Sequence, residues 1–482
     1  MKRKLIKAVC LILFFSLIVG GTNAVLRYRY TDSILSIQRF YEQEENTVDV
    51  LGLGTSHVYE GISPGVLYRE YGIAAYDLCA PAQAVWNTYH YFIEALKTQS
   101  PKAVIFDVYM LNTNEPYDTP ANAIKTTYGM KWSKNRTDAI SASFEHADLP
   151  SLMLPFLQYH SRYAEMTEKD DAPQSRQSAY FGKCYKGYTV YDEITQIKLP
   201  DVSKFTATRQ LADKHLLYYK RIIDLAVRNK ITIYIVSIPY AIAQDTQTTV
   251  NTARAIAKDY KSKYVKFIDL NARLDKIGID VNTDFANNQH LNRSGSEKVT
   301  KYLGKIISSQ LKLKDRRGDP AYQTWEEDAE LFYRGLDNFR LKTTTDVKKY
   351  AKLLSGMTED YTVILADNFG KSADKTAASE FMSKNFGVAH GKGGGLWIRD
   401  GDKAFRTLAE AGKNYRQYMP FNPRDEVMLT VSRTNKQKPC QISLNGNALS
   451  AEQNSVTVFV YDNRIRAAVD TVVLSPDNGL KR

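Results

Sequence analysis

Short apolar runs alternate with longer amphipathic stretches over residues 46–311. The short runs are rich in Val, Ile and aromatic residues, as buried strands are, whereas the longer stretches repeat apolar positions at helical spacing. The pattern predicts strands at 48–54, 73–78, 103–109, 231–237 and 265–269. It predicts helices at 64–71, 83–97, 209–229, 248–260 and 294–311. This alternation favours an α/β fold whose parallel sheet is covered by helices on both faces.

The chain begins with a basic segment followed by an apolar one. Lys2, Arg3, Lys4 and Lys7 precede the apolar run at 8–21. A basic flank before an apolar core is typical of a secretory signal or an uncleaved signal anchor, with the basic side inside. We expect residues 1–27 to be a single-pass anchor in the cell membrane, with residues 28–45 as a stalk and the rest outside the cytoplasm. Cleavage after Thr22-Asn23-Ala24 is the alternative.

Two further segments break the α/β rhythm. Residues 112–203 are polar, aromatic and irregular, and this stretch is too long for a simple loop, so we expect an insertion with helices over the active-site mouth. Residues 312–326 are charged and contain Gly and Pro, which favours a linker. Beyond them, residues 327–482 are richer in strand patterns and predict a second, smaller α+β domain.

The charge of the chain changes the picture of its partners. The chain has 65 Lys and Arg against 53 Asp and Glu, a net charge of +12. Such a protein attracts anionic polymers or acidic lipid headgroups. The basic residues are dispersed, without a zinc-finger spacing or an RNA-binding signature, so we expect no nucleic-acid partner. The four cysteines suggest neither a disulfide framework nor a metal site, and we expect no cofactor.

Two motifs carry candidate chemistry. The first, Gly54-Thr55-Ser56-His57, follows the first buried strand, where a serine is exposed above the sheet and backbone N–H groups can hold an oxyanion. The second contains Asp284 and His290 and precedes the last helix of the same domain. A histidine there can take a proton from Ser56. His57 is a second candidate base, although neighbouring residues on a tight turn tend to point apart.

Over residues 46–311 the sequence resembles extracytoplasmic SGNH/GDSL-hydrolase-like proteins related to DltD and to the alginate O-acetylation proteins. The motifs that carry this resemblance are Leu53-Gly54-Thr55-Ser56-His57, Gly61-Ile62-Ser63-Pro64, Tyr71-Gly72-Ile73, 101–107, 159–163, Lys186-Gly187-Tyr188 and Asp284 with His290-Leu291-Asn292. The resemblance implies a flavodoxin-like, three-layer fold. It also implies acyl transfer to a cell-envelope polysaccharide or teichoic acid beside a membrane-bound O-acyltransferase, with Ser56 as nucleophile and His290 as base.

The resemblance also implies further site residues. The oxyanion hole would use backbone N–H groups of Ser56 and of Cys79 or Ala80. His160 and Arg162, together with His57, would line the path of an anionic substrate. A glycan O-acyl esterase would use the same serine with water as the acceptor. A catalytically inactive scaffold that binds the glycan or the membrane partner is the alternative from another class.

One position departs from the pattern of these relatives. They carry Asp three residues before the histidine, where this chain has Asn287. In a serine protease the change from Asp to Asn lowers turnover about 10⁴-fold. Three interpretations stay open: a Ser56–His290 dyad, a triad completed by Asp284, or a site without catalysis. The Asn donor of the third block is also missing, and Asp107 stands in its place.

The C-terminal part loosely resembles the interleukin-like EMT inducer domain. The motifs concerned are 360–364, 387–388, 396–400, 441–446, 458–462 and 469–472. That resemblance implies a β-rich fold and suits either glycan binding or docking of a partner protein.

Overall fold

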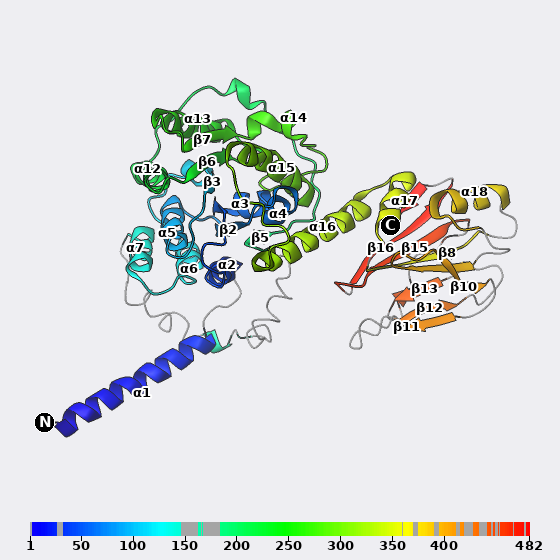
Figure 1. Cartoon of the computed structure of the whole chain (residues 1–482), viewed down its shortest axis with the longest axis horizontal. Helices are drawn as coiled ribbons and strands as arrows, with labels where there is room; N and C mark the ends of the chain where they lie inside the picture. The colour runs from blue at the N-terminus through cyan, green and yellow to red at the C-terminus, as the bar shows by residue number, and fades with distance from the viewer. Residues whose placement is uncertain are drawn as a thin grey trace. The chain divides into compact units, whose positions relative to one another are not determined.

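The computed structural model describes the chain in two compact units, Met1–Tyr333 and Arg334–Arg482 (Figure 1). The described residues are 2–26, 32–145, 162–164, 166, 184–358, 360–369, 375–389, 395–410, 415–418, 428–432, 441–444, 447–448, 452, 454–465, 467–476 and 479–482.

The first unit is built on a five-stranded parallel sheet. Its strands are β1 (Val50–Gly54), β2 (Ala75–Cys79), β3 (Ala103–Asp107), β6 (Thr232–Ser237) and β7 (Val265–Asp269). Their order is β2-β1-β3-β6-β7, and every neighbouring pair is parallel. This is the strand order of the flavodoxin-like fold, so the predicted three-layer α/β architecture is confirmed.

The alternation of side chains along each strand creates one core on each face of the sheet. Leu51 and Leu53 point to one core, and Val50 points to the other. The helices over the first core are α2 (Asp32–Phe40), α5 (Val85–Ala95), α12 (Asp213–Arg228) and α13 (Gln244–Asp259). Those over the second core are α3 (Ser56–Gly61), α4 (Pro64–Tyr71) and α15 (Arg293–Gln310) (Figure 1).

The segment expected to be a stalk is instead part of the first core. Helix α2 carries Ile34, Leu35, Ile37 and Phe40, which are all buried. The Phe40 ring packs edge-on against Tyr76 of β2 at 5.1 Å, and the Tyr76 hydroxyl donates to the Ser36 carbonyl. The amphipathic face of this short helix is covered by the sheet, so residues 32–45 belong to the folded unit.

The expected linker at 312–326 is also folded onto the first unit. Arg316 donates two hydrogen bonds to the carboxylate of Asp49, at 2.8 and 3.0 Å. Trp325 is buried and its indole N–H donates to the carbonyl of Ala75, at 2.9 Å. A long helix, α16 (Gln323–Thr343), then runs through the boundary between the two units. A buried Trp and a paired Arg explain why a charged, Gly-containing stretch is held in place.

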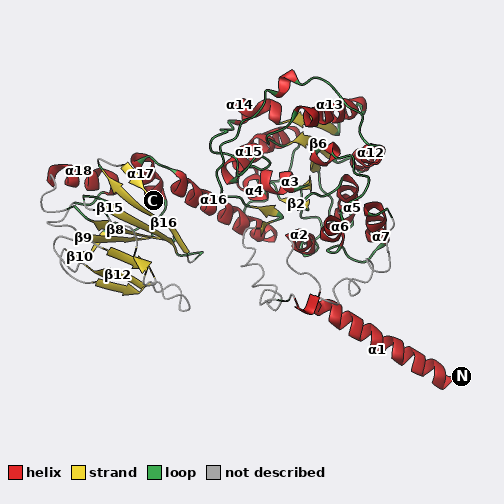
Figure 2. Ribbon diagram, turned by 180° about the vertical axis from the view of Figure 1, so that it is seen from behind, coloured by secondary structure: helices red, strands yellow, loops and turns green. Residues whose placement is uncertain are grey.

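The described helices of the insertion lie beside α5. They are α6 (Pro120–Thr127) and α7 (Lys134–Ser143), and Figures 1 and 2 both show them next to α5. Asn87 of α5 donates to Asp118, Thr126 and Ser143 at 2.8 to 3.1 Å. These helices extend the layer on one face of the sheet, whereas the sequence predicts helices of the insertion over the active-site mouth.

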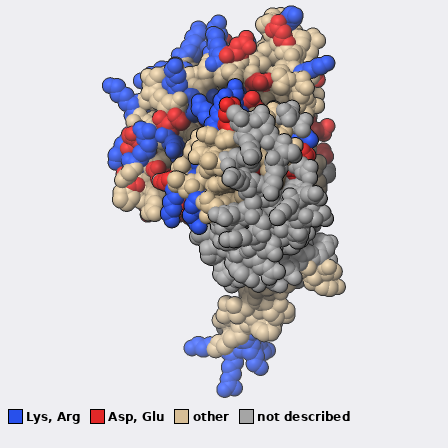
Figure 3. All heavy atoms as spheres, turned by 90° about the vertical axis from the view of Figure 1, so that its right-hand side faces the viewer, with Lys and Arg blue, Asp and Glu red and all other residues tan. Residues whose placement is uncertain are grey.

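The N-terminal helix α1 (Lys2–Leu26) contains an apolar stretch, Lys2–Thr22, with a mean hydropathy of 2.3. It is long and apolar enough to cross a membrane, although a cleaved signal sequence has the same length and composition. Its basic side chains gather at its beginning, and elsewhere on the face in Figure 3 basic and acidic side chains are interspersed.

The second unit contains two antiparallel sheets, as Figure 2 shows. The larger has the order β10-β9-β8-β15-β16-β17, and its strands are β8 (Tyr361–Asp367), β9 (Gly395–Asp400), β10 (Arg406–Glu410), β15 (Val456–Asp462), β16 (Ala467–Ser475) and β17 (Gly479–Lys481). The smaller contains β11 (Tyr415–Tyr418), β12 (Met428–Ser432), β13 (Gln441–Leu444) and β14 (Asn447–Ala448). With helices α17 (Val347–Gly356) and α18 (Lys375–Phe386), this unit confirms the predicted α+β class.

Candidate active site

The carboxyl end of β1 turns sharply into α3, and this turn presents Ser56. Gly54 has a φ of +147°, and a Cβ there would lie 2.9 Å from Val58 and 3.4 Å from Asp107. Thr55 caps α3, because its hydroxyl accepts a hydrogen bond from the N–H of His57. Glycine is therefore needed at the tightest point of the turn, and Ser56 becomes the first residue of α3, above the sheet edge.

The structure brings Ser56 and His290 together. His290 Nε2 lies 2.9 Å from Ser56 Oγ, within hydrogen-bond reach, although the two residues are 234 positions apart in sequence. The side chain of His290 is 20% exposed, so solvent still reaches the pair. Burial lowers the pKa of His290 below its usual 6.5, which keeps the imidazole neutral near pH 7. A neutral imidazole at this distance is able to accept the hydroxyl proton.

Neither of the residues considered as the third member of a triad contacts the His290 ring. Asp284 is fully buried and accepts hydrogen bonds from Lys298 Nζ at 2.6 Å and from the N–H of Asp280 at 2.7 Å. The side-chain oxygen of Asn287 accepts from the backbone N–H groups of Gln289 and His290. The alternative in which Asp284 completes a triad does not match this arrangement, because its carboxylate ties the loop to α15 instead.

The other ring nitrogen of His290 is left without support. Among the described residues, His290 Nδ1 is buried and has no hydrogen-bond partner. In a Ser-His-Asp triad this nitrogen donates to the carboxylate that fixes the tautomer. Among the described residues no acid contacts Nδ1, so Ser56 and His290 form a dyad without a triad acid at this nitrogen. This is one of the three arrangements left open by the sequence.

A carboxyl group that the sequence analysis missed lies near Nε2 of the His290 ring, across the ring from Nδ1, which has no partner among the described residues. Glu60 Oε2 is 3.5 Å from His290 Nε2, the nitrogen that faces Ser56, and the side chain of Glu60 is only 2% exposed. Ser56 and Glu60 are four residues apart on α3, so they project from the same face of the helix. The four-residue spacing could have predicted that Glu60 lies at the site, but only if Ser56 was known to begin a helix.

His57 packs against the ring of His290 and is not placed to act as the base. Its ring stacks on Tyr109 with centroids 3.9 Å apart, and lies edge-on to Tyr240 at 4.8 Å and to His290 at 5.5 Å. In the described structure neither of its ring nitrogens has a hydrogen-bond partner. Burial, with a smaller contribution from His290, lowers the pKa of His57 to about 3. Because it is buried, His57 does not line an open substrate path, contrary to the prediction.

Asp107 is a structural carboxyl at the end of β3. Its two oxygens accept hydrogen bonds from the N–H groups of Tyr109 and Ile238, at 3.0 and 3.2 Å. Burial raises its pKa to about 7, although those backbone hydrogen bonds act in the opposite direction. It therefore joins the ends of β3 and β6.

The remaining predicted residues are placed as follows. Cys79 is paired with Gly54 at the end of β2, and Ala80 follows it; both are buried at the sheet edge near Ser56. Their role as oxyanion donors stays a prediction, as does that of the Ser56 N–H. His160 and the side chain of Arg162 lie outside the described residues. No group of His, Cys, Asp and Glu able to hold a metal ion occurs in the described part of the chain.

The end of the insertion braces the loop that carries His290. The N–H of Thr195 donates to the carbonyl of Phe285, and its hydroxyl donates to the carbonyl of Ala286. Asn292 caps α15 and donates to the carbonyls of Thr283 and Glu193. Backbone and capping bonds thus fix the loop on both sides of His290.

Comparisons with known proteins add little beyond this geometry. No family model matches the chain, and no curated protein matches it. Among solved structures, one similar chain is a protein from Desulfitobacterium hafniense DCB-2 proposed to be lipolytic and of the G-D-S-L family. It is 14% identical, the alignment covers 54% of this chain and 99% of that chain, and the TM-score is 0.27. A likeness this distant carries no argument about activity.

Proposed function

We propose that this chain is a serine enzyme that transfers an acyl group, with Ser56 as the nucleophile and His290 as the general base. The observation that carries the proposal is the 2.9 Å approach of His290 Nε2 to Ser56 Oγ at the carboxyl edge of a parallel sheet. Ligand sites of open α/β sheets lie at this edge. The lowered pKa of His290 supports a neutral base at physiological pH.

In this proposal Ser56 Oγ attacks the acyl carbonyl while its proton passes to His290 Nε2. Backbone N–H groups of Ser56 and Ala80 stabilise the negative oxygen that forms. The imidazolium then protonates the leaving group, which departs and leaves an acyl ester on Ser56. An acceptor hydroxyl then gives its proton to His290 Nε2 and attacks the ester carbonyl. The imidazolium returns that proton to Ser56 Oγ as the serine leaves, which restores the hydroxyl and the neutral base. Throughout, the buried carboxyl of Glu60 lies beside the imidazolium at 3.5 Å.

We further propose that the acceptor is a cell-envelope glycan and that the enzyme is held at the membrane, outside the cytoplasm. The apolar length of α1, the net charge of +12 and the resemblance to DltD-related proteins support this setting. A membrane-bound O-acyltransferase would supply the acyl group from across the membrane. The second unit would bind glycan or this partner.

The decisive experiment is to trap the acyl ester. The full chain in nonionic detergent is mixed with p-nitrophenyl acetate, and intact-mass spectrometry follows the protein. We expect an acetyl adduct that maps to Ser56 and is lost in Ser56→Ala and His290→Ala, but kept in the control Ser308→Ala on the exposed face of α15. Faster release of p-nitrophenol on adding a sugar acceptor would indicate a transferase, and an acceptor-independent rate an esterase. A wild type that shows neither an adduct nor Ser56-dependent release of p-nitrophenol would refute the proposal.

A binding-only role is the second candidate, and one observation favours it. The unsupported Nδ1 of His290 is the feature expected of a site that has lost a triad acid. Complementation of a deletion strain separates the two roles. The Ser56→Ala protein would restore the wild-type envelope if the protein only binds, and would fail to restore it if the protein catalyses.

A further inference from the structure

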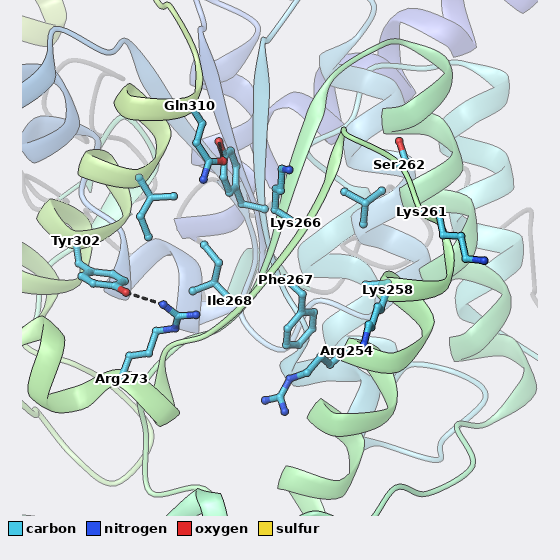
Figure 4. Close-up of a pocket in the computed structure, with 14 residues that line it drawn as sticks. Arg254, Lys258, Lys261, Ser262, Lys266, Phe267, Ile268, Arg273, Tyr302 and Gln310 are labelled. Atoms are coloured by element: carbon cyan, nitrogen blue, oxygen red, sulfur yellow. Dashed lines mark hydrogen bonds between the residues drawn. The ribbon is translucent and has the colours of Figure 1, made fainter.

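A basic hollow follows the outer edge of the sheet, away from Ser56. It has a volume of about 680 Å³ and lies along β7, which ends the strand order (Figure 4). A second hollow of about 380 Å³ adjoins it and shares Arg254, Phe267 and Arg273. We call the two together the β7 strip. It is lined by β7 itself, by α13 on one flank, and by α15 and the segment after β7 on the other.

Six cations and one carboxylate line the β7 strip. The cations are Arg254, Lys258, Lys261, Lys266, Arg273 and Lys276. The carboxylate, Asp269, is already paired with Arg254 and also accepts a hydrogen bond from Gln247. Within the described residues, none of the four lysines forms an ion pair. In the described part of the chain, Arg254 is therefore the one cation of the six that is paired with a carboxylate, and the strip keeps an excess of positive charge.

The floor of the strip is aromatic and polar. Phe267 is half-buried, and the guanidinium of Arg254 lies over its ring at 5.6 Å. On the other flank Arg273 donates to the hydroxyl of Tyr302 at 2.9 Å, as Figure 4 shows. Aromatic side chains offer an apolar face to sugar rings, and their polar groups hydrogen-bond to hydroxyls. Cations beside such faces suit a sugar that bears a negative charge.

We propose that the β7 strip binds an anionic glycan and guides it toward the sheet edge that carries Ser56. A five-residue strand is about 17 Å long, and β7 lies three strand spacings, about 14 Å, from β1. Its end at Asp269 is on the same edge as Gly54, because the sheet is parallel. The choice of a glycan rests on the proposed function, whereas the anionic character follows from the strip alone.

The simplest alternative is that these lysines only protect an exposed edge strand. Charged side chains on edge strands prevent pairing with another chain. However, Lys258, Lys261 and Lys276 lie outside β7; Lys258 and Lys261 line the larger hollow and Lys276 lines the smaller one. Edge protection does not require cations in those places.

Binding is tested with the full-length Ser56→Ala chain in nonionic detergent, so that turnover does not interfere. Calorimetry measures its affinity for a short oligogalacturonate, with a neutral malto-oligosaccharide as reference. The strip variant is Lys258→Gln/Lys261→Gln/Lys266→Gln. Its matched control is Lys102→Gln/Lys220→Gln/Lys312→Gln, which removes the same charge from exposed positions elsewhere.

We expect the strip variant to bind oligogalacturonate about tenfold more weakly, because each exposed ion pair is worth up to about fivefold. The control variant and the neutral sugar should show no such change. Equal loss in both variants would overturn the proposal in favour of net charge. Unchanged affinity, with self-association of the strip variant, would overturn it in favour of edge protection.

Two further arms identify the source of the negative charge. A glycerol-phosphate oligomer that binds with the same strip dependence would support the site and show that phosphate serves as well as carboxylate. Binding to phosphatidylglycerol vesicles without binding to oligogalacturonate would refute the glycan proposal. The ester assay, made on protein that keeps Ser56, distinguishes failure of the strip proposal from failure of the proposed function. If the strip does not bind glycan but the acyl-enzyme still forms, the proposed function is kept and the strip proposal is rejected. If the strip binds glycan but no acyl-enzyme forms, the strip proposal is kept and the proposed function is rejected.

Discussion

Replacing Glu60 with Gln tests whether the buried carboxyl stabilises the charge that His290 acquires. At 3.5 Å, Coulomb's law gives about 1 kcal/mol in water and about 5 kcal/mol at an effective dielectric constant of 20. If the carboxylate is ionised when the imidazolium forms, Glu60→Gln should lower kcat/KM by about 7-fold to about 3000-fold. Glutamine keeps the shape of the side chain, so the loss would reflect charge rather than packing.

Glu60 also has an effect that would reduce activity in the wild type. The carboxyl also favours the resting tautomer with a proton on Nε2, which is unable to accept one from Ser56. A hydrogen bond is worth about 0.5–1.5 kcal/mol net, and 3.5 Å is at its outer limit. The Coulomb energy between Glu60 and the imidazolium therefore exceeds the hydrogen-bond energy over most of its range of about 1 to 5 kcal/mol. As a result, the Glu60→Gln variant should lose activity.

The assay for Glu60→Gln is kcat/KM for p-nitrophenyl acetate as a function of pH, with the exposed Glu45→Gln as control. Loss of a neighbouring negative charge lowers the pKa of His290, so the acid limb of the profile should move to lower pH. A purely structural role would not move it. Activity within twofold of the wild type, with an unmoved limb, would refute the reasoning.

Three further outcomes follow from the geometry. Because burial lowers the pKa of His290 and only the neutral ring accepts a proton, kcat/KM of the wild type should fall toward acid pH with a midpoint below 6.5; a midpoint above 6.5 would contradict this. Asp284→Asn weakens the contact to Lys298 and should reduce stability to urea by about 1–3 kcal/mol, whereas a loss of activity without loss of stability would restore Asp284 as a triad member. Gly52→Ala places a Cβ 2.1 Å from the Asp77 carboxylate and should lower stability by about 1–3 kcal/mol, and an unchanged urea midpoint would show that the contact relaxes freely.

Most of the parallel sheet could be predicted from the sequence because β1, β2, β3 and β6 are buried along their whole length, and such strands are almost continuously apolar. The edge strand β7 is only partly buried, and the predicted 265–269 still coincides with it. The pairing of Ser56 with His290 could be predicted from the ends of the first strand and the last helix, because parallel strands present their carboxyl ends at one edge.

What the sequence did not show depends on tertiary contacts. Helix α2 looks like part of a polar stalk until Tyr76 covers its apolar face. The contacts of Asp284 could not be assigned, because a loop decides whether its carboxylate faces the histidine or Lys298. Glu60 gave no signal by itself, since a buried Glu is recognised only from what surrounds it.

The position of the acid relative to the ring changes what the site is able to do. In a Ser-His-Asp triad the carboxylate binds Nδ1–H, so it selects the basic tautomer and stabilises the imidazolium at once. Here Glu60 lies at the Nε2 side, and Nδ1 has no partner among the described residues. The basic tautomer therefore carries a buried, unsatisfied N–H, at a cost of about 1–3 kcal/mol. Glu60 offsets that cost only after the proton has left Ser56, which makes it a group that acts on the transition state more than on the resting enzyme. A slow enzyme that depends strongly on Glu60 is what this arrangement predicts.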